Sequence, residues 1–147
     1  MLSWKIKPIN CYPIISKMSM KDRCGKLETF QMNIKRGEIW LVTLDPMIST
    51  EMRNTRPVVV ISSNALAILP MRLVAPVTGW KDIFENNLWH IKIVPDRKNK
   101  LDRLSAVDLF QIRCMETKQF INRIGMIPHY TMKDIAKAAA LLIEYEK

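Results

Sequence analysis

An arginine at the start of an apolar segment is the first candidate for chemistry in this sequence. Arg56 directly precedes the β-branched run over residues 57–62, and a polar loop that contains Glu51 precedes the arginine. A strand holds its first residue in place, and a guanidinium there can bind two oxygens of one anion. The alternative is a surface arginine that only pairs with Glu51. Both readings are open from these residues alone.

A threonine at the end of another apolar segment is the second candidate. Thr78 follows residues 72–77 and precedes Gly79. A hydroxyl there can donate a hydrogen bond to a phosphate or orient a nucleophile, although threonine is also common in strands for packing reasons. His90 is interpreted as a solvated strand residue and His129 lies beside a proline, so neither histidine is assigned a catalytic role.

Acidic residues and cysteines do not form a metal-binding pattern. Asp45, Glu51 and Asp82 are spread over two loops, whereas two-metal nucleases need several carboxylates that converge on the ions. The three cysteines are far apart in the sequence, which argues against a zinc site and against a disulfide framework. We therefore expect no metal and no other cofactor.

The segments that must position these side chains read mainly as strands. Apolar patterns predict strands over residues 38–44, 57–62, 72–77, 88–94, 104–109 and 121–127. Residues 64–69 predict a helical turn, and residues 45–54 and 79–87 predict loops. After Thr131, apolar residues recur at helical spacing. The expected fold is mainly β (α+β), a small, SH3-like, strongly bent β-barrel with a C-terminal α-helix.

Length, composition and charge restrict the class of protein. The chain has 147 residues, of which 48% are hydrophobic, which suits one domain with a real core. No apolar run approaches the roughly 20 residues of a membrane span, and the N-terminus does not read as a signal peptide. We therefore expect a cytoplasmic protein that does not enter membranes. A net charge of +9 predicts a polyanion or an acidic protein as partner.

The basic charge is shared between two parts of the chain. Residues 1–31 lack periodicity and predict a poorly ordered N-terminal extension, and residues 32–147 predict the folded domain. The extension holds six Lys or Arg and two Asp or Glu. Its net charge of +4 is therefore almost half of the total, and the domain itself is only moderately basic.

Several motifs together resemble the MazF/PemK family of bacterial toxins. They are Arg36-Gly37-Glu38-Ile39-Trp40, Leu44-Asp45-Pro46, the segment 55–62, Ala75-Pro76-Val77-Thr78 and Gln111-Ile112-Arg113. The resemblance covers roughly residue 32 to the end. It implies the toxin of a type II toxin–antitoxin system, a metal-independent and sequence-specific endoribonuclease that cleaves single-stranded RNA, mainly mRNA.

The implied reaction assigns roles to the candidate residues. The 2′-hydroxyl attacks its own phosphate, which gives a cyclic phosphate and a free 5′-hydroxyl. By this resemblance Arg56 stabilises the negative charge and Thr78 donates to the phosphate, while Glu51 acts as a base or orients the arginine. The first loop departs from the family, because Ser49 and Met52 replace its usual residues there.

Residues near the two loops are candidates for RNA binding. Single-stranded RNA is commonly read by stacking on aromatic rings and by hydrogen bonds to base edges. Trp80 with the adjacent Lys81 lies in the second loop, and Arg53 and Asn54 lie in the first. We expect these side chains to contact the RNA, although Trp80 could equally cover the core.

The resemblance also implies partners and leaves two alternatives open. It implies a homodimer and a cognate antitoxin with an acidic tail, and DNA is expected to bind only through the antitoxin complex. One alternative is a non-catalytic toxin of the same fold that acts by binding DNA gyrase. The other is a decayed, inactive homologue. Arg56 and Thr78 are both present, and this favours the nuclease.

Overall fold

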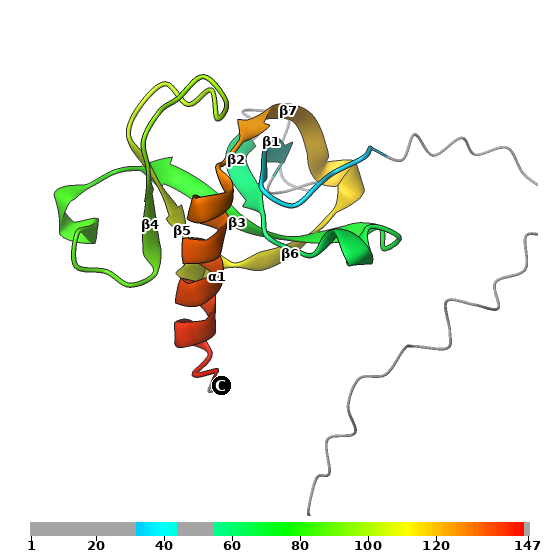
Figure 1. Cartoon of the computed structure of the whole chain (residues 1–147). Helices are drawn as coiled ribbons and strands as arrows, with labels where there is room; N and C mark the ends of the chain where they lie inside the picture. The colour runs from blue at the N-terminus through cyan, green and yellow to red at the C-terminus, as the bar shows by residue number, and fades with distance from the viewer. Residues whose placement is uncertain (1–31, 44–54, 146–147) are drawn as a thin grey trace, which may run out of the picture. The chain divides into compact units, whose positions relative to one another are not determined.

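The computed structural model describes residues 32–43 and 55–145 (Figure 1). The predicted extension over residues 1–31 and most of the first predicted loop lie outside them. The strands are β1 (Glu38–Thr43), β2 (Thr55–Val60), β3 (Met71–Gly79), β4 (His90–Ile93), β5 (Ser105–Asp108), β6 (Arg113–Glu116) and β7 (Phe120–Met126). The helices are α1 (His129–Leu142) and the short 3-10 turns η1 (Asn64–Leu66), η2 (Asp82–Phe84), η3 (Leu109–Gln111) and η4 (Thr117–Gln119).

All strand pairs are antiparallel, and the order across the sheet is β4-β5-β3-β2-β1-β7, with β6 also paired to β3. The nine-residue strand β3 is shared, because its first residues pair with β6 and its last residues pair with β5. In the described part of the chain, β4 and β7 end the sheet and do not pair with each other. The mainly β fold with a C-terminal helix is confirmed, and the bent sheet is not a closed barrel.

Strand β2 is buried on both faces, as its continuous β-branched run predicts. Val59 packs into the core cluster beneath α1, together with Ile39 and Ile135. Val58 and Val60 point the other way, into a second cluster around Trp40 and Phe120. The sheet therefore separates two apolar layers, and β2 is held firmly between them.

Two features differ from the sequence prediction. Strand β6 was not predicted, because only Met115 of its four residues is buried and the segment carries no apolar alternation. Helix α1 begins at His129 after Pro128, without a side-chain cap, and Thr131 lies buried inside its first turn rather than ahead of it. Among the residues that the structure describes, no helix is both long and apolar enough to span a membrane.

Candidate active site

Strands β2 and β3 bring Arg56 and Thr78 to one end of the sheet. The last pair of this ladder is Val58 with Pro76. Side chains alternate along a strand, so Arg56 shares the face of Val58 and Thr78 shares the face of Pro76, which is the same face. Arg56 is exposed and Thr78 is half-buried. The two side chains that the sequence singled out therefore stand on one face of neighbouring strands.

A proline lies at the point where the ladder between β2 and β3 ends. The N–H of Ile61 donates to the carbonyl of Leu73 on β3 at 2.9 Å, so alternate N–H groups of β2 face β3. Two residues earlier Val59 pairs with Ala75. Two residues before Val59, the N–H that would face β3 belongs to Pro57, and proline has no N–H to donate. One of the two hydrogen bonds that would continue the ladder therefore cannot form, and the last pair of the ladder is Val58 with Pro76.

A cleft of about 320 Å³ opens where the ladder ends. Strand residues from β2 and β3 form one wall, and the opposite wall comes from the loop between β4 and β5, residues 94–104, called here the β4–β5 loop. The lining residues are Pro57, Val77, Thr78, Gly79, Leu101, Asp102, Arg103 and Ser105. Arg56 directly precedes Pro57 but does not line the cleft, and alternation along β2 turns its side chain to the other face of the strand.

Arg103 is a functional candidate that no motif in the sequence indicates. Ser105 pairs with Gly79, so the residue two positions earlier reaches the end of β3. The Arg103 guanidinium packs over Gly79, with Nε and Cζ 3.5 Å and 3.6 Å from the position that a Cβ on Gly79 would take. Among the described residues, no carboxylate lies within 4.0 Å of Arg103 or Arg56. Arg103 thus brings a cation into the lining of the cleft.

The β4–β5 loop is held by side chains of its own. Asn99 is fully buried, and its Oδ1 accepts hydrogen bonds from the backbone N–H groups of Asp96 and Leu101, both at 3.0 Å. Its Nδ2 donates to the carbonyl of Val94 at 2.8 Å. The carboxylate of Asp96 accepts from the N–H groups of Lys98 and Asn99 at 2.7 Å and 2.6 Å. These hydrogen bonds all lie within the loop and fix the course of its backbone.

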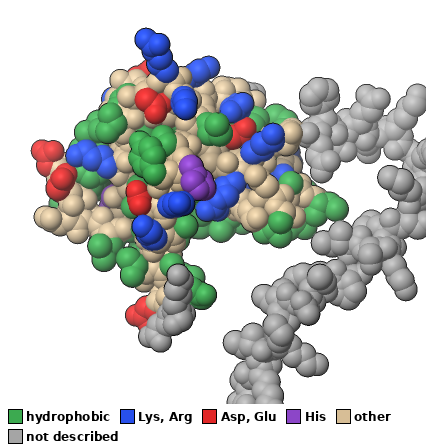
Figure 2. All heavy atoms as spheres, in the orientation of Figure 1, with side chains coloured by type: hydrophobic (Ala, Val, Ile, Leu, Met, Phe, Trp, Pro, Cys, Tyr) green, Lys and Arg blue, Asp and Glu red, His purple; other side chains and the backbone are tan. Residues whose placement is uncertain are grey.

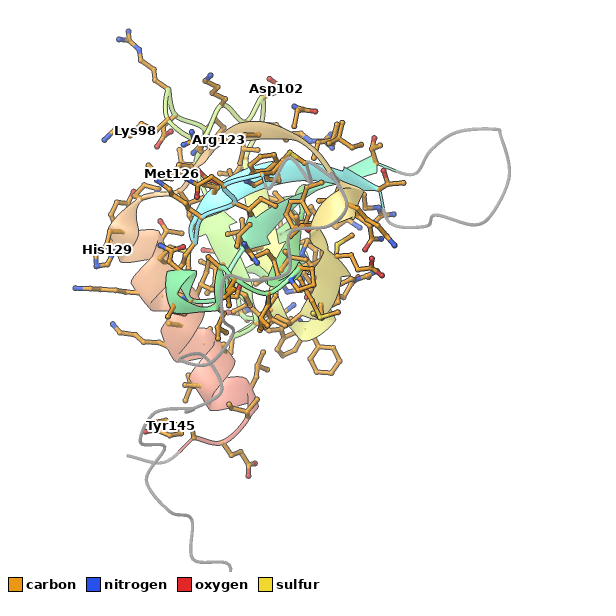
Figure 3. All side chains as sticks on the ribbon, turned by 90° about the vertical axis from the view of Figure 1, so that its right-hand side faces the viewer. Lys98, Asp102, Arg123, Met126, His129 and Tyr145 are labelled. Atoms are coloured by element: carbon orange, nitrogen blue, oxygen red, sulfur yellow. The ribbon has the colours of Figure 1, made fainter. Side chains whose placement is uncertain are left out.

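Strand β7 supports the other side of this loop. A Cβ on Gly125 would lie 2.4 Å from the carbonyl oxygen of Asn99 and 2.5 Å from that of Lys98, so only glycine permits this approach. The N–H of Met126 donates to the Lys98 carbonyl at 3.0 Å. Figure 3 places Lys98 on this loop near Arg123 of β7, at the end of the domain opposite Tyr145.

Positive charge gathers on the same part of the surface. Within the β4–β5 loop, Arg97, Lys98, Lys100 and Arg103 are all exposed. The loop also carries two carboxylates, Asp96 and Asp102, and that of Asp96 accepts hydrogen bonds from backbone N–H groups. Figure 2 shows Lys and Arg side chains distributed over the upper part of the face that carries this loop and the start of α1. The surroundings of the cleft therefore favour an anionic ligand.

Trp80 and Lys81 follow β3 directly, next to the cleft. The backbone N–H of Trp80 donates to the carbonyl of Leu104 at 2.9 Å. Its ring meets Phe84 edge-on with the ring centres 5.9 Å apart, and the ammonium of Lys92 lies 4.4 Å from its ring centre. Trp80 is half-buried and Lys81 is exposed. The tryptophan thus has two partners within the domain.

His90 is not the solvated residue that the sequence predicted. Its side chain is 8% exposed, and its ring stacks on Phe84 with the centres 3.8 Å apart. Asn87 Nδ2 lies 3.2 Å from its Nδ1, and the Asp108 carboxylate lies 3.9 Å from its Nε2. The Asp108 carboxylate also accepts a hydrogen bond from Gln111 at 2.6 Å. This cluster fixes the segment between β3 and β4, and it does not line the cleft.

Three of the predicted site residues, Glu51, Arg53 and Asn54, lie outside the described residues, in the loop that leads into β2. Their roles stay predictions. Among the described residues, no group of three or more His, Cys, Asp and Glu side chains is placed to hold a metal ion.

Comparisons with known proteins agree with this architecture. Residues 35–143 match the family model described as PemK-like, MazF-like toxin of type II toxin–antitoxin system. Toxin MazF-mt6 of Mycobacterium tuberculosis is similar in structure, with a TM-score of 0.60, 18% identity, and coverage of 75% of this chain and 99% of that one.

Two further solved structures extend the comparison. A mycobacterial endoribonuclease in complex with its cognate antitoxin gives a TM-score of 0.62 at 16% identity, covering 78% of this chain and 98% of that one. MazF from Deinococcus radiodurans gives a TM-score of 0.58 at 15% sequence identity, covering 76% of this chain and 96% of that one. At these identities the likeness concerns the fold.

Proposed function

The chain belongs to the family of PemK-like, MazF-like toxins of type II toxin–antitoxin systems, and on this premise we propose that it is a metal-independent, sequence-specific endoribonuclease of single-stranded RNA, mainly mRNA. The observation that carries the proposal is that Arg56 and Thr78 share one face at the end of the β2–β3 ladder, where Thr78 also lines the cleft. Two of the similar structures are also named endoribonucleases.

The proposed reaction needs no group from outside the substrate as nucleophile. The 2′-oxygen forms a bond to the neighbouring phosphorus, and the bond from phosphorus to the 5′-oxygen breaks. The 2′-hydroxyl loses its proton and the leaving 5′-oxygen takes one up from water, so the products are a cyclic phosphate and a 5′-hydroxyl. Arg56 binds the non-bridging oxygens, where negative charge increases in the transition state. Thr78 donates a hydrogen bond to one of them, and Glu51 accepts the proton of the 2′-hydroxyl or orients Arg56.

Binding of the RNA extends from the cleft to the two neighbouring loops. Trp80 offers an aromatic ring for a base, and the exposed Lys81 beside it attracts a phosphate. Arg53 and Asn54 supply donors and acceptors for base edges from the first loop. Lys92 covers the ring of Trp80 in the free protein, so a base that stacks on that side must displace its ammonium.

The proposed partners are a cognate antitoxin and a second copy of the chain, in the cytoplasm. Support for the antitoxin comes from similar structures named as complexes of an endoribonuclease with its cognate antitoxin and of MazE with MazF. Support for the homodimer comes from a row of exposed apolar side chains from η1 into β3, namely Leu66, Ile68, Leu69, Met71 and Leu73. DNA binds only through the antitoxin complex.

An Arg56→Ala variant tests the proposed function. Purified protein should cleave single-stranded RNA in EDTA, and the variant should cleave at least about a hundredfold more slowly, as expected for loss of a donor to the developing charge. The 5′ ends of cellular RNA, sequenced after induction of the protein, give the target motif.

Lys137→Ala serves as the matched control, because Lys137 is exposed on α1 and does not line the cleft. This control should cleave like the unaltered protein. Cleavage by Arg56→Ala at the unaltered rate would contradict the role of Arg56. Intact cellular RNA together with gyrase-dependent DNA breaks would instead identify the gyrase-binding alternative.

A further inference from the structure

We propose that Arg103 is a second phosphate-binding residue of this site, which holds the RNA phosphate next to the one that reacts. The proposal rests on the proposed RNA-cleaving function, and it assigns a role to a residue on the β4–β5 loop. Its basis is the position of Arg103 in the cleft wall that faces Thr78 and Pro57.

The guanidinium of Arg103 is available to a ligand. It packs flat against Gly79, whose missing side chain leaves room for Nε, Cζ and Nη2 at 3.5 Å, 3.6 Å and 3.7 Å from the Cβ position. Within the described part of the chain it forms no ion pair, and the neighbouring Asp102 is not within ion-pairing distance of it. A planar fork with open donors is the usual phosphate-binding group in proteins.

The loop that carries Arg103 is already ordered before any ligand binds. Asn99 and Asp96 close the loop with backbone hydrogen bonds, and Gly125 lets it rest on β7. Closer to the cleft, the hydroxyl of Ser105 donates to the carbonyl of Arg103 at 2.9 Å. Because the backbone is fixed, little conformational entropy is lost when the arginine binds a phosphate.

The two arginines lie on different elements. Arg56 precedes Pro57 on the β2 wall, and Arg103 lies on the wall formed by the β4–β5 loop. Thr78 and Arg103 line the same cleft, and Arg103 packs over Gly79, the residue after Thr78, so a phosphate at Thr78 would have its neighbour in the RNA within reach of Arg103. Such an interaction exists in the bound substrate as well as in the transition state, so it strengthens binding without changing the chemical step.

Arg103→Ala, Arg103→Lys and Lys137→Ala are the variants to compare with the unaltered protein. Affinity is measured for an RNA that carries a 2′-deoxy nucleotide at the cleavage site and therefore cannot react. Arg103→Ala should bind about tenfold more weakly, and the slope of log affinity against log salt should fall by about 0.7, the value for one phosphate of a single strand that the protein no longer neutralises. Arg103→Lys should recover part of the affinity and of the salt slope, and Lys137→Ala should match the unaltered protein.

A second measurement distinguishes binding from chemistry. At saturating RNA, the single-turnover cleavage rate of Arg103→Ala should stay within about threefold of the unaltered rate. The proposal is overturned if folded Arg103→Ala, checked by circular dichroism, binds with unaltered affinity and salt slope, or if Lys137→Ala loses as much affinity as Arg103→Ala. Failure of the proposed function gives a different result, because the unaltered protein itself would then not cleave RNA.

Discussion

Asn99→Ala should destabilise the domain far more than its position in a loop suggests. The side chain is fully buried and makes three hydrogen bonds, with the N–H groups of Asp96 and Leu101 and the carbonyl of Val94. Each such bond contributes about 0.5–1.5 kcal/mol, and unsatisfied partners add to the loss. Water reaches some of them when the loop relaxes, so we expect a loss of about 2–4 kcal/mol.

The assay is equilibrium unfolding in urea. With a slope of about 1–3 kcal/mol per molar urea for a domain of this size, the midpoint should fall by about 1 M or more. Asn86→Ala is the matched control, because Asn86 is exposed on the segment between β3 and β4, and it should stay within about 0.5 kcal/mol of the unaltered protein. A loss below about 1 kcal/mol for Asn99→Ala would refute the view that this residue holds the loop.

Two further substitutions test packing that no sequence pattern reveals. Gly125→Ala should lower the free energy of unfolding in urea by about 1–3 kcal/mol, because the new Cβ would lie 2.4 Å from the carbonyl oxygen of Asn99. Gly79→Ala is the control, because its Cβ would meet Arg103 at an ordinary contact distance of 3.5 Å. An equal loss of stability in Gly125→Ala and Gly79→Ala would refute the packing role of Gly125. Arg72→Met should cost about 2–4 kcal/mol, because the buried guanidinium of Arg72 donates to the carbonyls of Ile34, Ala67, Leu69 and Met71. The exposed Arg113→Met should leave stability nearly unchanged, and equal midpoints for the two variants would contradict that role.

The strands that were predicted well are those whose burial leaves a pattern in the sequence. The second half of strand β2, residues 58–60, is a continuous apolar run because both of its faces are covered. The turn at η1 and the helix α1 also follow from local residues. Strand β6 leaves no such pattern, because three of its four residues are exposed and its place depends on pairing with β3.

The candidate site was only half predictable for a similar reason. Arg56 and Thr78 were recognised from short motifs at strand ends. Arg103 was not, because its position beside Gly79 follows from the register of β3 with β5, and no local pattern encodes that register. The same holds for His90, whose burial depends on Phe84 and Asp108 from other parts of the chain.

Pro57 makes the position of the cleft less sensitive to substitution of neighbouring side chains than a cavity in a protein core usually is. A cavity defined by packing shrinks or fills when a neighbouring side chain changes. Here the opening is set by a covalent property of one residue, the absent N–H that stops the ladder between β2 and β3. The walls and the adjoining loops can therefore diversify over evolution while the position of the cleft stays the same.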